Sequence, residues 1–439
     1  MSARESLPDF ATPVDNGLLR FLTCGSVDDG KSTLIGRLLF DTRAILADTL
    51  HAIERTSARR GLEAADLSLL TDGLQAEREQ GITIDVAYRY FSTGTRKYII
   101  ADAPGHEQYT RNMVTAASTA DLAVILIDAR KGVLTQTRRH SYVAHLLGIR
   151  HLVVAVNKMD LVGFQREVFD RIRAEYSAFA AELNIQGVQF IPLSALEGDM
   201  LVGRGERLGW YDGPTLLEAL ESAPAAHEDI GEQFRFPVQY VCRPQQSADL
   251  RLHDYRGFMG RVESGSVAIG DEVAVLPSGR RTRVKSIHLG STDLPRAGVA
   301  QSVSLLLEDE IDISRGDMLV HADEIGHDGS ARVARHLDAM LCWLSDAPLD
   351  PQRKYLIRQT TRDAKAAVSK ISYRLDINSL ERLPAERLGM NDIARVGMRL
   401  ASPLVVDAYA ANRATGAFIV IDESSNSTVG AGIILGAEA

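Results

Sequence analysis

The chain has 439 residues, of which 45% are hydrophobic, and carries a formal net charge of −9 at pH 7. This length predicts about three domains, and the acidic balance argues against a large basic surface, so we expect no nucleic acid partner. Because no apolar run approaches the roughly 18 residues that span a membrane and residues 1–17 are too polar for a signal peptide, we expect a cytoplasmic protein with no membrane partner.

The first predicted elements are a strand over residues 18–24 and a helix over residues 31–40, joined by a phosphate-binding loop. The residues of this loop and helix start that we expect to bind a nucleotide are Gly25, Ser26, Val27, Asp28, Asp29, Gly30, Lys31, Ser32 and Thr33. Backbone N–H groups of residues 26–32 should face the β-phosphate, Lys31 should bridge the β- and γ-phosphates, and Ser32 should ligate Mg²⁺. The alternative is a glycine-rich turn that binds nothing.

A second strand, over residues 97–101, leads into the motif Asp102-Ala103-Pro104-Gly105-His106. Ligands of open α/β sheets bind at the carboxyl ends of the strands, so we expect Asp102 to hold Mg²⁺ through water. Gly105 can offer its N–H to the γ-phosphate. His106 should orient the attacking water, although a plain loop histidine is the alternative.

Guanine selection is predicted from Asn157-Lys158-Met159-Asp160, which follows a strand over residues 152–156. The Asp160 carboxylate can accept from two donors of guanine that adenine lacks. Asn157 and Lys158 should brace the base and the loop. In the last motif, Ser194-Ala195-Leu196, the Ala195 N–H can reach the guanine O6. With Gly81-Ile82-Thr83, five motifs occur in order, and they identify a GTP-binding protein.

Near residue 225 the pattern of strands alternating with helices changes to short strands with glycine turns. We expect an α/β P-loop G domain with a doubly wound, mostly parallel sheet over residues 1–226, of which residues 1–17 form a polar arm. Two antiparallel β-barrels should follow, over residues 232–325 and 330–439. The strands predicted there are residues 234–242, 257–264, 271–276, 281–288 and 302–307, and then 332–344, 354–360, 361–375, 392–400 and 418–421.

A G domain followed by two barrels resembles the translation elongation factor family of GTPases. Residues 72–85, which include Thr83, are similar to the switch segment of the elongation factor 1-alpha branch. This resemblance implies that Thr83 supplies a second hydroxyl to Mg²⁺ and joins Lys31 and His106 in the catalytic set.

Within that family, residues 27–30, 80–91 and 412–422 resemble the GTPase subunits of bacterial sulfate adenylyltransferases. The resemblance implies a regulatory GTPase with GTP and Mg²⁺ as cofactors. Its GTP hydrolysis would drive the synthesis of adenosine 5′-phosphosulfate and pyrophosphate from ATP and sulfate. The resemblance implies that this synthesis takes place on a partner, the small adenylyl-transferring subunit, and the single set of nucleotide-binding motifs in this chain agrees with that.

Two other functions stay open. One is an elongation factor that carries aminoacyl-tRNA, and the other is a non-catalytic GTPase that only scaffolds the sulfurylase. The role of Asp29 is open too, because translation factors usually carry His or Ala at this position. A solvated acidic side chain is the simplest explanation of it.

Overall fold

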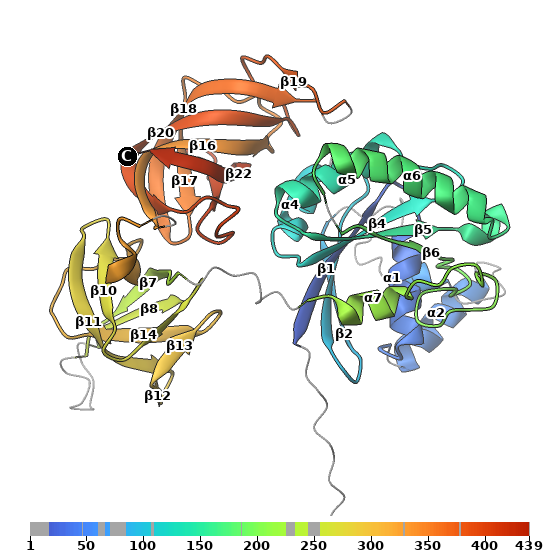
Figure 1. Cartoon of the computed structure of the whole chain (residues 1–439), viewed down its shortest axis with the longest axis horizontal. Coiled ribbons are helices and arrows are strands. Elements are labelled where there is room, and N and C mark those ends of the chain that lie inside the picture. Colours follow the sequence, from blue (N-terminus) through green and yellow to red (C-terminus); the bar gives the residue numbers. More distant parts are fainter. Residues whose placement is uncertain are drawn as a thin grey trace, which may run out of the picture. The chain divides into compact units, whose positions relative to one another are not determined.

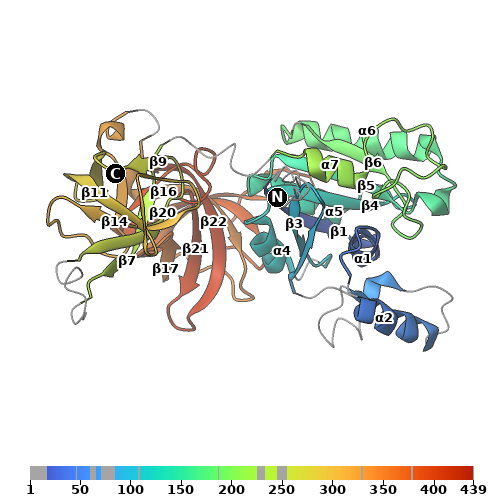
Figure 2. The same cartoon turned by 90° about the horizontal axis from the view of Figure 1, so that it is seen from below.

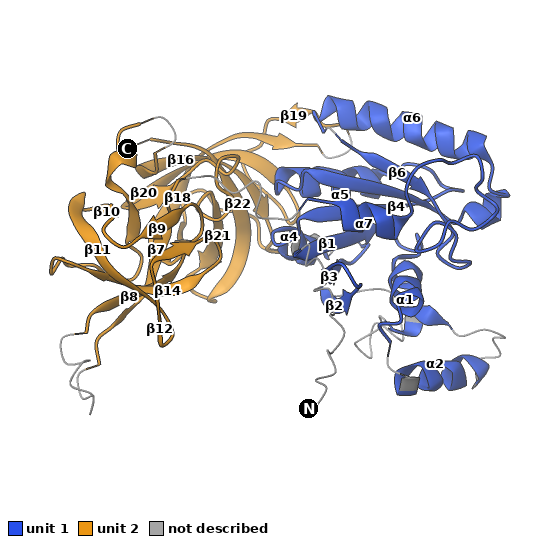
Figure 3. Cartoon of the chain, turned by 60° about the horizontal axis from the view of Figure 1, so that its bottom comes forward, with its two compact units in different colours: residues 1–226 blue, residues 227–439 orange. Residues whose placement is uncertain are grey.

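The computed structural model describes residues 17–45, 47–59, 66–70, 85–106, 109–185, 187–224, 233–244, 255–327, 330–376 and 379–438. The chain divides into two compact units, residues 1–226 and residues 227–439, and each is described by itself (Figure 3). No helix in the described ranges is long and apolar enough to cross a membrane. The predicted switch residue Thr83 lies outside these ranges.

The first unit alternates strands and helices along the chain. Its strands are β1 (Leu18–Gly25), β2 (Ala87–Ser92), β3 (Lys97–Asp102), β4 (Leu122–Asp128), β5 (His151–Asn157) and β6 (Gln189–Pro192). Its α-helices are α1 (Lys31–Asp41), α2 (Ala47–Arg59), α4 (Thr110–Ala117), α5 (Thr135–Leu146), α6 (Arg166–Glu182) and α7 (Leu216–Ser222), with the short 3₁₀ helices η1 (Leu67–Leu70) and η3 (Met159–Val162).

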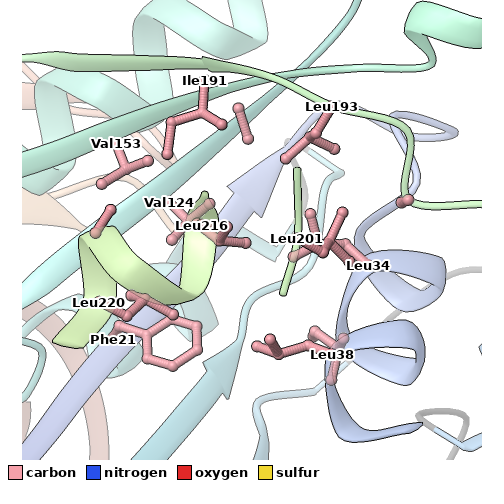
Figure 4. Packing of buried hydrophobic residues seen from close by; sticks show 14 of the residues in the cluster. Phe21, Leu34, Leu38, Val124, Val153, Ile191, Leu193, Leu201, Leu216 and Leu220 are labelled. Atoms are coloured by element: carbon pink, nitrogen blue, oxygen red, sulfur yellow. The ribbon is translucent and has the colours of Figure 1, made fainter. Parts of the chain in front are cut away.

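The six strands form one sheet in the order β2-β3-β1-β4-β5-β6, in which β2 alone is antiparallel to its neighbour. Helices α4, α5 and α6 cover one face, and α1 and α7 pack on the other (Figure 1). Alternate strand residues such as Phe21 and Val124 meet Leu34, Leu38 and Leu220 in the core of the second face (Figure 4). The helix α2 lies beyond α1, away from the sheet (Figure 2).

The last turn of α7 is held by Arg96, which lies in the turn between β2 and β3 and is 3% exposed. Its Nη1 donates to the carbonyl oxygens of Leu220 at 3.0 Å and Ala223 at 2.5 Å. Carbonyl groups at a helix C-terminus lack partners within the helix, and a cation is favoured beside them. Arg96 therefore fixes the point at which the chain leaves the first unit.

The second unit is built from strands. They are β7 (Phe236–Cys242), β8 (Gly257–Arg261), β9 (Ser266–Ala268), β10 (Glu272–Leu276), β11 (Arg280–Leu289), β12 (Thr292–Leu294), β13 (Arg296–Gly298), β14 (Ser302–Leu307), β15 (Met318–His321), β16 (Arg332–Trp343), β17 (Lys354–Gln359), β18 (Arg362–Leu375), β19 (Arg382–Leu383), β20 (Ile393–Val406), β21 (Ala417–Asp422) and β22 (Ser427–Glu438), with the 3₁₀ helix η5 (Ala322–Glu324).

These strands form two antiparallel barrels. The first has the order β10-β15-β7-β8-β14-β11 and closes because β10 also pairs with β11. The second has the order β17-β21-β22-β16-β20-β18 and closes where β17 pairs with β18. The predicted fold class, a G domain followed by antiparallel barrels, is confirmed.

A buried ionic cluster joins the two barrels into one unit. Arg235, which is 1% exposed, donates from Nε and Nη2 to both carboxylate oxygens of Asp407, each at 3.0 Å. Its Nη1 donates to Glu324 Oε2 at 2.7 Å. Beside this cluster, Asn412 Nδ2 donates to Ser264 Oγ at 2.9 Å. Residues from both barrels therefore share one hydrogen-bonded network.

Several strand boundaries differ from prediction. The strand predicted over residues 392–400 runs on to Val406, and β9, β12, β13, β15, β19 and β22 were not predicted at all.

Candidate nucleotide-binding site

The predicted motifs meet at the carboxyl edge of the parallel sheet. Gly25 ends β1, Asp102 ends β3 and Asn157 ends β5, whereas Ser194, Ala195 and Leu196 follow β6. The residues Ser26, Val27, Asp28, Asp29 and Gly30 form the loop, and Lys31, Ser32 and Thr33 open α1. Segments as far apart in the chain as Gly25 and Leu196 thus surround one place, as expected for ligands of open α/β sheets.

One half of the phosphate loop closes on itself rather than toward a ligand. The Ser26 N–H, which we expected to face the β-phosphate, donates instead to Asp29 Oδ2 at 2.6 Å. The Asp29 side chain is 1% exposed, so the expectation of a solvated acidic residue is wrong. Gly30 and Asp28 have positive φ angles of 92° and 65°, which turn the loop into the start of α1.

Lys31 lies beneath this loop and is 7% exposed. Its Nζ donates to the carbonyl oxygens of Gly25 at 3.0 Å and Ser26 at 2.9 Å. Burial lowers the pKa of Lys31, while the nearby Asp102 and Asp29 carboxylates oppose that shift. Gly105 packs directly on the lysine, because a Cβ built there would lie 2.6 Å from Nζ. The Gly105 segment and the phosphate loop are therefore in contact through Lys31.

The residues predicted to hold Mg²⁺ suit that ion in chemistry. Asp102 is 1% exposed, and its Oδ1 accepts from Thr23 Oγ1 at 3.2 Å. Ser32 adds a hydroxyl in the first turn of α1. Carboxylate, hydroxyl and water oxygens are the ligands that Mg²⁺ prefers. The His106 side chain is exposed in the segment that follows β3, and its ring centroid lies 6.4 Å from that of Tyr109.

Asn157 joins the phosphate loop to residues 194–196, which form the guanine loop. Its Nδ2 donates to the Asp29 carbonyl at 2.8 Å, and its Oδ1 accepts the Ala195 N–H at 2.9 Å. Asn157 is 1% exposed. The Ala195 N–H that we expected to reach guanine O6 is thus directed at Asn157 instead.

Lys158 is fixed by Asp28, which belongs to the predicted site, and by Asp128, which the sequence prediction did not include. Its Nζ donates to the Asp28 carbonyl and lies 3.0 Å from Asp128 Oδ2. Asp128 ends β4 and is 1% exposed, and Arg130 Nη2 donates to it at 2.6 Å. Although burial alone would raise the pKa of Asp128, hydrogen bonds from Arg130 and Lys158 hold it below its usual range. The position of Asp128 at the carboxyl end of a buried strand could have indicated this role.

The carboxylate predicted to select the base, that of Asp160, is held by Ser194. Asp160 Oδ1 accepts from Ser194 Oγ at 2.6 Å, which orients the carboxylate. The Leu196 side chain is 69% exposed, and its carbonyl accepts from Arg37 Nη1 at 2.9 Å. Arg37 lies on α1 and also contacts Asp41. The helix that follows the phosphate loop therefore contacts the guanine loop as well. Nothing in the local sequence pattern indicated Arg37.

Comparisons with known proteins agree with this geometry. Residues 16–225 match the elongation factor Tu GTP binding domain, and residues 336–435 match the GTP-eEF1A C-terminal domain-like family. A protein of Laribacter hongkongensis named sulfate adenylyltransferase subunit 1 is 55% identical over 96% of this chain and 86% of its own length. A protein of the same name from Cellvibrio japonicus is also 55% identical, over 95% of this chain and 86% of its own. A Sulfurovum protein of that name is 53% identical over 95% and 87%.

Proposed function

Because the chain belongs to the sulfate adenylyltransferase subunit 1 family, we propose that it is the regulatory GTPase subunit of that enzyme, in which GTP hydrolysis drives sulfate activation. The coupled reaction joins sulfate to the adenylyl group of ATP and releases pyrophosphate. We assign that reaction to a separate small subunit and place the complex in the cytoplasm. The names of the relatives favour this function over aminoacyl-tRNA delivery.

The observation that carries the proposal is the buried link made by Asn157. It connects the loop that would hold the phosphates, through Asp29, to the loop that would read the base, through Ala195. A site in which both ends of a nucleotide are held by one network suits an intact guanine nucleotide. Asp160 would accept from the guanine N1–H and amine, and Lys31 would compensate the phosphate charge.

For hydrolysis, His106 would orient a water for in-line attack on the γ-phosphate, which leaves as inorganic phosphate with GDP as the other product. Gly105 would offer its N–H to the γ-phosphate and report its loss, because it packs on Lys31. Ser32, Thr83 and Asp102, the last through water, would hold Mg²⁺. The ion would neutralise charge that builds on the phosphate oxygens.

The coupling proposal is tested with the complex and its parts. Alone, the chain should hydrolyse GTP slowly and form no adenylylsulfate. The small subunit should bring synthesis and faster GTP turnover, because each ligand of a coupled system must favour a state that the other also favours. Lys31→Ala should abolish the stimulation by GTP and leave GTP-independent synthesis intact, whereas the exposed Lys365→Ala should behave as wild type.

Two results would contradict the proposal. Adenylylsulfate formation by this chain alone would show that the adenylyl-transfer site lies on this chain and not on the small subunit. Synthesis that responds to GTP binding but shows no GTP turnover would favour a scaffold that does not use hydrolysis.

A further inference from the structure

The phosphate loop contains one buried carboxylate with an unusual set of contacts. Asp29 Oδ2 accepts the Ser26 N–H at 2.6 Å, and the Asp29 N–H donates to the Ser26 carbonyl at 3.3 Å. The other oxygen, Oδ1, is buried and has no hydrogen-bond partner among the residues that the structure describes. Burying a carboxylate that is only partly paired is costly, and burial raises the pKa of this group. Such a cost suggests that the contact with Ser26 has a role.

The same residue is the point at which the phosphate loop meets the guanine loop. The Asp29 carbonyl accepts from Asn157 Nδ2, which is tied in turn to the Ala195 N–H. The side chain of Asp29 therefore shapes the first half of the phosphate loop. Its backbone carbonyl fixes that loop to Asn157 at the end of β5. A shift of Asp29 would move both ends of the site.

We propose that Asp29 is a positioning residue that closes the phosphate loop before the nucleotide arrives and ties the shape of that loop to the guanine loop. The inference rests on the proposed GTP binding and gives a role to a loop residue whose role was open. Preorganised loops bind more tightly because less ordering remains to be done on binding. Without the carboxylate, the partly buried Ser26 N–H loses its partner, and a loop with positive φ angles at Asp28 and Gly30 loses the bond that holds it.

Dissociation of a fluorescent GDP analogue, mant-GDP, tests the proposal in the full chain. Asp29→Ala should release mant-GDP roughly tenfold faster or more, the loss expected for a hydrogen bond to a charged group. Asp29→Asn should release it no faster than wild type, because the amide oxygen can still accept from Ser26. Single-turnover hydrolysis of GTP that is already bound should change less than release in Asp29→Ala and should keep the wild-type rate in Asp29→Asn.

Asp121→Ala is the matched control. The Asp121 carboxylate accepts the Arg20 N–H at 2.8 Å, a bond of the same kind near the other end of β1. This variant should release mant-GDP at the wild-type rate. If Asp29→Ala does not fold, Asp29→Val, which fills more of the space and also cannot accept, replaces it.

The outcomes separate the two proposals. A wild-type chain that fails to bind mant-GDP would refute the proposed function. Wild-type binding with an unchanged release rate in Asp29→Ala, or an Asp29→Asn variant as fast as Asp29→Ala, would refute the role of Asp29 alone.

Discussion

Asp160 is the carboxylate proposed to select the base. Ser194 Oγ holds its Oδ1 at 2.6 Å, so the carboxylate is oriented without the nucleotide. Asp160→Asn places an amide donor where an acceptor is needed, and we expect GTP affinity to fall by roughly a hundredfold or more while xanthosine triphosphate becomes preferred. Isothermal titration with both nucleotides measures this exchange. Asp170→Asn, at an exposed carboxylate on α6, should leave both affinities unchanged, and a similar result for Asp160→Asn would remove Asp160 from the base site.

His106 should affect the rate of hydrolysis and not the affinity for GTP. Its side chain is exposed beside the Gly105 segment, where a water could be positioned against the γ-phosphate. We expect His106→Ala to bind GTP almost as well as wild type and to hydrolyse it roughly 10²-fold more slowly. Single-turnover phosphate release checks the rate, with His51→Ala on α2 as the control histidine. Normal turnover in His106→Ala would move the catalytic role to another residue.

At the scale of the element, α1 serves both ends of the proposed nucleotide. It begins at Lys31 and presents Arg37 one and a half turns later, where the guanidinium binds the Leu196 carbonyl at 2.9 Å. We expect Arg37→Ala to weaken guanine nucleotide binding by about three- to tenfold, the loss of one charge-assisted hydrogen bond that is partly exposed. Competition binding with GDP measures it. Arg166→Ala, whose ion pair is exposed on α6, should have no effect.

The elements of the G domain that adjoin a motif could be predicted because their patterns of apolar residues are local, whereas the strands β2, β4 and β6 were not predicted. The strand at residues 18–24 and the helix at 31–40 differ from β1 and α1 by a single residue at one end. The contacts that hold the site could not be predicted, because Arg37 and Leu196 are 159 positions apart and their meeting depends on the whole sheet.

In the second unit, strands were missed where tertiary packing overrides local preference. Glycine is unfavourable in strands, so β22 was not predicted, yet a Cβ at Gly432 would lie 2.3 Å from the Phe418 ring. The missing side chain there permits the close packing of β21 on β22. Similarly, Pro403 lies inside β20, beyond the end of the strand predicted over residues 392–400. The structure accommodates it where the pairing of β16 with β20 shifts register.

At the scale of the whole molecule, the ionic cluster around Arg235 decides whether the barrels behave as one body. Arg235→Ala would leave the buried Asp407 carboxylate without its main partner, and we expect it to lower the free energy of unfolding of the second unit by about 3–5 kcal/mol. Scanning calorimetry of the full chain measures the loss, with the transition of the first unit as an internal reference. Arg261→Ala, at an exposed pair with Glu263, should cost at most about 1 kcal/mol. Equal effects of the two substitutions would contradict the role given to the cluster.

Arg96 determines where a pulling force would enter the first unit. The chain leaves this unit after α7. Arg96, in the hairpin of β2 and β3, donates to carbonyl groups at the C-terminal end of that helix. Tension along the connecting chain would therefore load that hairpin before it could unravel α7. The strand β2 begins at Ala87, four residues after Thr83 in the sequence, so the hairpin follows the residue expected to supply a second hydroxyl to Mg²⁺. Mechanical load on the connection would then reach the strand that follows the proposed Mg²⁺ ligand in the sequence.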